Sequence, residues 1–335
     1  MHVKWAQGLP GLLMLALVSA PAPAEELVVY SGRSDKFVRP VAEAFEHESG
    51  IDVVLHSAKS TELLNKLRLE GARTPADLYI SNDAGNLQIG SELGLFRPVP
   101  AEVAERIPAN FRARDDTWIG LSGRARVLVV NTRAEGVGFI ASVFDLADPR
   151  LAGRLGLTHS ANASFIAGIT VYMEEAGTER VREWLEGLKA NVDGRVYSHH
   201  SSIVGDVAAG RKAVGLVNHY YIYRHLDERP DAPIDILLPD QGEDGMGVAW
   251  NTAGIAISRH TDHPEAAEAF VEFLTSEEGQ YIFAEVNREY PTRADVPAAP
   301  QVPPRESYEV ADVPMAELGR RRDATLDLIE RVGMP

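Results

Sequence analysis

Two adjacent tyrosines, Tyr220 and Tyr221, are the residues whose type and spacing most clearly suggest chemistry. They follow Asn218 and His219 in the segment LVNHYYIYRH, whose apolar start is typical of a buried strand. In a continuing strand the two side chains would point to opposite faces, so both reach one ligand only if the backbone turns into a helix there. A helix start would also bring the positive end of its dipole to the phenols, which favours phenolate.

A pair of phenolates offers two hard, anionic oxygen donors, which suit a hard trivalent cation. The cation must supply the driving force for ionisation, because an ordinary tyrosine has a pKa of about 10. The alternative is plain packing, since adjacent tyrosines are common on strands and on helix faces. The motif by itself leaves both interpretations open.

The remaining motifs do not indicate an enzyme. The chain has no Walker A, G-x-S-x-G, H-E-x-x-H or G-x-G-x-x-G pattern after its first strand. A binding protein is therefore expected. A hydrolase or transferase built on the same scaffold stays the rival from a different class, because a fold alone does not decide function.

Composition limits the chemistry further. The chain has no cysteine, so any metal site must use oxygen or nitrogen ligands, and neither a disulfide nor a lipoprotein anchor is available. The formal net charge is −16 over 335 residues, which argues against nucleic acid and anionic membranes as partners.

The first residues predict export. Lys4 forms a short basic region, an apolar core runs from Leu9 to Val18, and Ala22-Pro23-Ala24 is an A-x-A cleavage motif. We expect residues 1–24 to be a signal peptide and the mature chain to begin near Glu25, in the periplasm.

Strand and helix patterns alternate along the rest of the chain, which predicts an α/β fold with mainly parallel strands. The apolar segments 118–133 and 247–258 read as long strands that cross between two lobes. Such paired crossings form a hinge that opens and closes around a ligand. We expect an N-terminal lobe of residues 25–122 plus 251–300 and a C-terminal lobe of residues 123–250 plus 301–335.

An ordered set of segments carries a resemblance that covers the chain from Leu27 almost to its end. The set comprises VVYSGRS, TPADLYISNDAG, WIGLSGRARVLVVNTR, LTHSANASF and LVNHYYIYRH. With these segments the chain resembles the periplasmic ferric-ion-binding proteins of bacterial iron uptake. The resemblance implies a two-lobed class II binding protein with a two-strand hinge, which takes Fe(III) with carbonate or phosphate as synergistic anion and delivers it, as a monomer, to an ABC transporter permease in the inner membrane.

The resemblance also implies roles for individual residues. Tyr220 and Tyr221 match the paired metal ligands. The residues that match the anion site are Arg33, Asn162, Ala163, Ser164, His200 and Asn218.

The sequence departs from the family pattern at two ligand positions. Some members place a histidine after the first strand and a glutamate after the third, where this chain has Ser34 and Asn82. Asp83 is a candidate substitute, although a role as a turn residue is its alternative. Further cleft candidates are Arg124 and His219, and further ligand candidates considered are His159, His199 and Tyr30. Because of these departures, an alternative function stays open: a binding protein of the same architecture whose ligand is an organic anion, a sugar phosphate or a polyamine.

Overall fold

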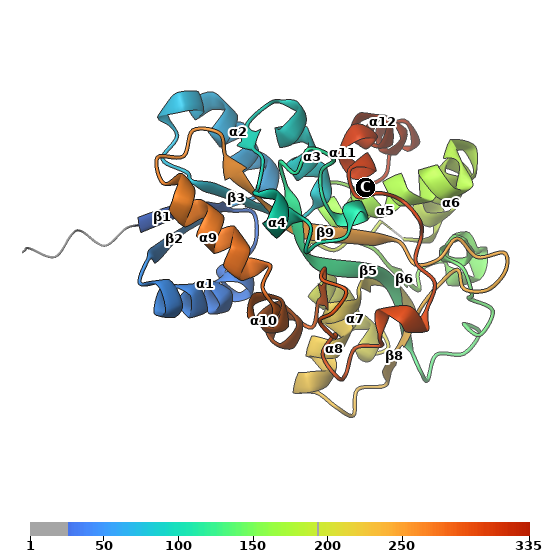
Figure 1. The fold of residues 1–335 in the computed structure, drawn as a ribbon. Helices are drawn as coiled ribbons and strands as arrows, with labels where there is room; N and C mark the ends of the chain where they lie inside the picture. The colour runs from blue at the N-terminus through green and yellow to red at the C-terminus, as the bar shows by residue number, and fades with distance from the viewer. Residues whose placement is uncertain (1–25, 193) are drawn as a thin grey trace, which may run out of the picture.

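The computed structural model describes residues 26–192 and 194–335, which form two α/β lobes joined by long strands (Figure 1). The predicted signal peptide, residues 1–24, and the expected mature start at Glu25 lie outside the described residues. No helix in the described ranges is long and apolar enough to cross a membrane.

The first lobe is built on parallel strands in the order β2-β1-β3, as the alternating pattern predicted. Strand β9 extends this sheet antiparallel to β3, and the short strands β4 and β10 pair with β9 and β5. The strands are β1 (Glu26–Ser31), β2 (Asp52–Ser57), β3 (Leu78–Ser81), β4 (Phe96–Arg97), β9 (Trp250–Ser258) and β10 (Tyr290–Pro291). The helices are α1 (Asp35–Ser49), α2 (Ser60–Glu70), α3 (Ala84–Glu92), α4 (Ala101–Ala104), α9 (Pro264–Leu274) and α10 (Glu277–Asn287).

Helix α1 shows how sequence pattern becomes packing in this lobe. Its apolar residues recur at helical spacing, and Val38, Val41 and Phe45 are buried. Gly50 ends the helix in the left-handed conformation at φ 74°, which glycine adopts without a Cβ penalty. The helix thus covers one face of the sheet and leaves the strand ends free.

The second lobe has fewer strands than the first. Its strands are β6 (Leu155–Gly156), β7 (Val214–Asn218), β8 (Ile234–Leu237) and the second part of β5 (Ile119–Asn131). Its helices are α5 (Ala163–Ala176), α6 (Thr178–Asn191), α7 (His200–Ala208), α8 (His219–Glu228) and α12 (Arg322–Val332), with α11 (Glu317–Arg320) between the lobes. Short 3₁₀ helices complete the chain at η1 (Gly71–Arg73), η2 (Ala109–Phe111), η3 (Val143–Ala147), η4 (Pro149–Leu151) and η5 (Arg305–Ser307).

Strand β5 belongs to both lobes. Residues 119–125 pair with β9, whereas residues 126–130 pair with β7. All of its residues except Val130 are buried. The segments predicted as crossing strands, 118–133 and 247–258, therefore do run between the lobes as β5 and β9. The placement of the lobe boundaries at 122/123, 250/251 and 300/301 stays a prediction.

The C-terminal segment contacts both lobes. Gly319 of α11 lies against Gln88 of α3, and Met315 N–H donates to the Asn110 carbonyl. Beyond α11, the Thr325 hydroxyl of α12 lies 2.9 Å from that of Thr170 on α5. The chain ends beside the loop that precedes α5, where the Ser160 N–H donates to the Pro335 carbonyl at 2.7 Å.

Three local patterns in the sequence predict structure that the chain does not form. The segment RVYSHH predicts a strand at residues 195–200, but only Tyr197 makes a bridge, to Thr158. The sequence also predicts Ser60 or Thr61 as the cap of α2 and serines as the caps of α7; these residues lie inside the helices, and Lys59 and His199 occupy the cap positions without a side-chain capping bond. Residues 315–335 read as one closing helix, which is interrupted at Arg321 between α11 and α12.

The crossing of β5 and β9 generates a stability prediction. A Cβ on Gly254 would lie 2.5 Å from the Ile119 carbonyl oxygen and 2.7 Å from Leu87 Cδ1. Since the backbone of a paired strand cannot move away, Gly254→Ala is expected to lower the free energy of unfolding by about 1–3 kcal/mol, measured by urea denaturation. Gly205→Ala is the control, because a Cβ there meets nothing within 4 Å in helix α7 and alanine favours a helix. An equal loss in both variants would contradict the prediction.

Candidate functional site

The tyrosine pair lies at the junction of β7 and α8. Strand β7 ends at Asn218, and α8 begins at His219, so Tyr220 and Tyr221 occupy the first turn of the helix. Their ring centroids are 4.3 Å apart with an angle of 33° between the rings. The backbone turn that the motif requires is therefore present, and it brings both phenols to one side of the junction.

Two arginines of the hinge strand lie beside the phenols. Arg124 and Arg126 are two residues apart on β5, so their side chains share one face of the strand, and both are buried. Arg126 Nη1 donates to Asn218 Oδ1 at 3.0 Å, but the Nε and Nη2 atoms of both arginines have no hydrogen-bond partner. Buried donors without partners are costly, so these guanidinium groups indicate a place for an anion.

His200 is another buried group near the phenols without a hydrogen-bond partner. It begins helix α7, its ring centroid lies 5.1 Å from that of Tyr221, and neither ring nitrogen has a hydrogen-bond partner. Burial lowers the pKa of His200 well below its ordinary value, and Arg126 and Arg124 lower it further. The imidazole is therefore neutral, and it has both a donor and an acceptor to offer a ligand.

Burial also controls the charge of the other groups. It raises the pKa of Tyr221 far above the ordinary value, and the neighbouring Tyr220 adds to this shift through its charge and hydrogen bond. Burial lowers the pKa of Arg126 to about 10. The free site thus combines the neutral phenol of Tyr221 with the cationic guanidinium group of Arg126, and Tyr221 ionises only when a cation takes the place of its proton.

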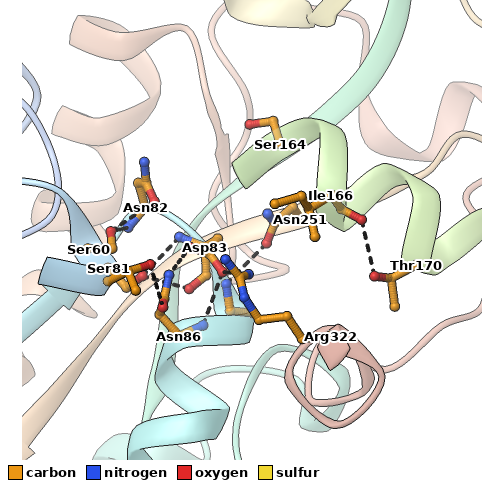
Figure 2. A network of polar contacts seen from close by, with 12 residues as sticks. Ser60, Ser81, Asn82, Asp83, Asn86, Ser164, Ile166, Thr170, Asn251 and Arg322 are labelled. Carbon is orange, nitrogen blue, oxygen red and sulfur yellow. Dashed lines mark hydrogen bonds and ion pairs between the residues drawn. The ribbon is translucent and has the colours of Figure 1, made fainter. Parts of the chain in front are cut away.

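The start of helix α5 lies next to this group. The Asn162 side chain caps the helix by accepting from the N–H groups of Ser164 and Phe165 at 3.0 and 3.2 Å. The Ser164 hydroxyl, shown at the start of α5 in Figure 2, accepts from Asn218 Nδ2 at 3.1 Å. The residues predicted around the anion, Asn162, Ala163, Ser164 and Asn218, are thus brought together near the phenols.

Arg33 has a strong partner that the sequence did not reveal. Its Nη2 donates to both carboxylate oxygens of Glu289, at 2.9 and 2.8 Å, and its Nη1 donates to the Ser122 hydroxyl at 2.9 Å. Burial tends to raise the pKa of Glu289, but Arg33 and Arg124 lower it overall, so the carboxylate is ionised. No local signal links two residues 256 positions apart, and Arg33 does not present a free guanidinium in this structure.

The three polar residues after the first and third strands serve local structure. Asp83 caps α3 by accepting from the Asn86 N–H at 3.0 Å, and it lies 3.7 Å from Arg322 (Figure 2). Asn82 Oδ1 accepts from the Ser60 hydroxyl at 2.9 Å. Ser34 is exposed before α1 and makes no capping bond. Asp83 therefore takes the turn role that was its alternative.

His219 and Tyr30 also have partners of their own. His219 Nδ1 accepts from the Ala125 N–H at 3.1 Å, and Nε2 lies 2.8 Å from the Arg288 carbonyl, to which it donates. Tyr30 is buried in the first lobe and donates to Glu70. Neither side chain has a free atom for a metal ion.

A cavity of about 580 Å³ lies between the lobes next to the start of α5. The first lobe contributes residues that follow β1, β2 and β3, and the second contributes residues before α5 and α7. The lining residues are Gly32, Ala58, Lys59, Ser60, Thr61, Glu62, Asn82, Asn86, His159, Ala161, Asn162, Ala163, His199 and Arg322. The interlobe cavity is therefore lined in part by five of the predicted residues: Asn82, His159, Asn162, Ala163 and His199.

The described part of the chain offers few other metal ligands. Within residues 26–192 and 194–335, no group of three or more His, Asp or Glu side chains could hold a metal ion. A hard cation bound here would therefore depend on the phenol pair and on donors brought by an external anion.

The buried state of His219 generates a prediction about pH. Burial lowers its pKa to about 4, against about 6.5 when exposed. The unfolded chain therefore binds more protons than the folded chain between these values, so stability falls as the pH is lowered from about 6.5 toward 4. Without added iron, the free energy of unfolding falls between pH 6.5 and 5 in the wild type, and this fall should be about 1–2 kcal/mol smaller in His219→Gln. Urea titrations check this, with the exposed His260→Gln as control; equal pH slopes in wild type and His219→Gln would contradict it.

Comparison with known proteins assigns the chain to a family. A model of bacterial extracellular solute-binding proteins matches residues 41–309. Iron uptake protein A1 of Synechocystis is 30% identical, with 84% of this chain and 79% of that protein covered. The major ferric iron-binding protein of Neisseria meningitidis serogroup A is 29% identical, with 96% and 97% covered.

Solved structures agree with the fold. Iron-bound HitA from Pseudomonas aeruginosa has a TM-score of 0.86 at 27% identity, and the alignment covers 92% of this chain and 99% of that one. The Trichodesmium protein IdiA (FutA), in complex with iron and citrate ligands, has a TM-score of 0.82 at 28% identity, with 92% and 100% covered. The α/β architecture with two lobes is therefore confirmed, and the chain belongs to the family of bacterial extracellular solute-binding proteins.

Proposed function

We propose that this protein captures ferric iron in the periplasm and delivers it to an ABC transporter permease in the inner membrane. The observation that carries the proposal is the pair of phenols in the first turn of α8, with ring centroids 4.3 Å apart. The relatives add support, since they include a ferric iron-binding protein and an Fe(3+)-binding periplasmic protein of Serratia marcescens. They are binding proteins, which favours a carrier over an enzyme.

In this proposal Tyr220 and Tyr221 bind the ferric ion as phenolates. Each phenol loses its proton to solvent when the metal arrives, because proton and metal compete for the same oxygen. The positive end of the α8 dipole stabilises the resulting charge. The buried guanidinium groups of Arg124 and Arg126 stabilise it as well.

A synergistic anion completes the site, with carbonate and phosphate as the anions that the resemblance implies. Support comes from the unpartnered donors of Arg124, Arg126 and His200 and from the helix start at Asn162, Ala163 and Ser164. Arg33 reaches such an anion only by leaving Glu289. We therefore assign to Arg124 and Arg126 the guanidinium role that the resemblance placed on Arg33.

Capture is followed by closure around β5 and β9, the strands shared by the lobes. Closure excludes water from the ligand, and reopening or acidification releases it. The same proposal includes a signal peptide cleaved after Ala24 and a monomeric state. It also includes an N-terminal lobe of residues 25–122 plus 251–300 and a C-terminal lobe of residues 123–250 plus 301–335.

A ferric–phenolate complex is coloured, which provides the test. Iron added to the apo protein should produce a visible charge-transfer band. Tyr220→Phe and Tyr221→Phe should each weaken it, and the double variant should abolish it, as measured by absorbance and by iron retained after gel filtration. Tyr223→Phe is the matched control, because this phenol lies on the same helix but has no part in the proposed site.

Two outcomes would contradict the proposal. One is a colourless wild-type protein at saturating iron. The other is a double Tyr220→Phe and Tyr221→Phe variant that retains iron as well as the control does. Circular dichroism and thermal unfolding of each variant show whether a lost band reflects a lost site or a lost fold.

A further inference from the structure

Phe37 is an aromatic side chain that the hydrophobic cores of the two lobes do not use. It lies in the first turn of α1, outside the stripe of core residues that includes Val38, Val41 and Phe45. Among the described residues it belongs to neither of the two buried apolar clusters, and it is only half-buried. Since an aromatic ring contributes a large contact area, a ring kept off the core is available for a contact elsewhere.

The contact that Phe37 makes joins the two lobes. Its ring lies edge-on to that of Tyr220, with centroids 6.1 Å apart and an angle of 75° between the rings. Phe37 belongs to α1 of the first lobe, whereas Tyr220 belongs to α8 of the second. Tyr220 also stacks on Tyr221 of its own helix, and only 5% of its surface is exposed. One of the two proposed iron ligands is therefore covered by a ring from the opposite lobe.

Arg224 adds a second contact between the same two helices. It lies four residues after Tyr220 on α8, so both side chains share one face of the helix. The Arg224 guanidinium carbon is 5.1 Å from the centroid of the Phe37 ring, within the range of a cation–π interaction. From the first lobe, Lys36 and Arg33 approach the same ring at 5.0 and 5.3 Å. The Phe37 ring thus lies among cations of both lobes.

Further along, the same face of α8 contacts the end of α10 (Figure 1). Asp227 accepts from Arg288 Nε at 3.1 Å, and the Arg288 carbonyl accepts from His219 at 2.8 Å. The Asn287 side chain in turn donates to the Phe37 carbonyl at 3.1 Å, so α1 and α10 form one supporting surface. The helix that carries the phenols is therefore held against the first lobe along one face.

Contacts of this kind act on the release of a ligand. A hinge rotation that separates the lobes breaks the contacts of Phe37 with Tyr220 and Arg224. The contacts therefore stabilise the closed protein and are absent from the open one. Interactions that exist only in the bound, closed state change the dissociation rate much more than the association rate.

We propose that Phe37 is a latch residue, which packs on Tyr220 across the lobes and, together with Arg224, holds the protein closed over bound iron. This inference rests on the proposed function and concerns the regulation of the same site. The phenols determine whether iron binds, and Phe37 determines how slowly it leaves. Phe37 does not touch the metal, so it is a positioning residue.

Rates of iron release and capture test the latch. The iron-loaded mature protein is mixed with excess EDTA, and the decay of the charge-transfer band gives the release rate. Apo protein mixed with ferric nitrilotriacetate gives the capture rate. We expect Phe37→Ala to release iron about tenfold faster than wild type, with Phe37→Leu between the two. Capture rates and the band intensity per bound iron should stay within about twofold of wild type.

Arg224→Met tests the second contact of the latch. It keeps the length of the side chain and removes the charge, so release should be about threefold faster. Arg229→Met, which removes a charge at the end of the same helix, is its control. Phe139→Ala is the control for Phe37→Ala, because it removes another half-buried ring, whose cation is Arg150. Both controls should release iron at the wild-type rate.

The outcomes separate the latch from the proposed function. A normal band and wild-type release in Phe37→Ala would overturn the latch and leave ferric binding intact. Equal increases in capture and release would also overturn it, since the ring would then be only a barrier to entry. Faster release with a weaker band per bound iron would do the same, because the ring would then support the metal ligands themselves.

The wild type and the apo variants complete the test. A wild-type protein without a band would overturn both the latch and ferric binding. Thermal unfolding of each apo variant shows whether the fold is intact. Should Phe37→Ala fail to fold, Phe37→Leu and Arg224→Met decide the question, and wild-type release in both would overturn the latch.

Discussion

Burial of guanidinium donors without hydrogen-bond partners is the constraint on which this site depends. Arg124 and Arg126 lie inside the molecule, and the Nε and Nη2 atoms of both have no hydrogen-bond partner in the described chain. Such groups are expensive to bury, and the cost is recovered only when an anion arrives. In the proposed function, the phenolates of Tyr220 and Tyr221 supply part of that negative charge once a metal replaces their protons. Charge balance would then link the metal, its accompanying anion and the two arginines into one binding event.

Few secondary-structure elements bring the two arginines and the two phenols together. Strand β5 carries both arginines at the point where its partner changes from β9 to β7. Strand β7 continues directly into α8, which sets the phenols beside them. Because the same strand links the lobes and presents the charges, a rotation of the lobes also shifts the environment of the arginines. In the proposed function, binding and closure are therefore coupled through the backbone of β5.

The sequence predicted what depends on local pattern. The strand-to-helix turn before the tyrosine pair, the crossing strands and the helices of both lobes followed from apolar spacing and glycine stops. It could not predict pairings between distant residues, so the bond of Arg33 to Glu289 was missed. Asp83 could be read as a ligand or as a cap, and only the bond to Asn86 decides. The break at Arg321 depends on packing of α11 against α3 and has no signal in composition.

The position of Pro335 has a practical consequence for handling the protein. Its carbonyl accepts from Ser160, two residues before the asparagine that caps α5. A purification tag or fluorescent label added after Pro335 would therefore lie beside the loop that carries His159 and Ala161, two residues that line the interlobe cavity. An oligohistidine tag there would also place a competing metal chelator next to the cargo. Affinity tags for iron titrations should therefore be removed before measurement.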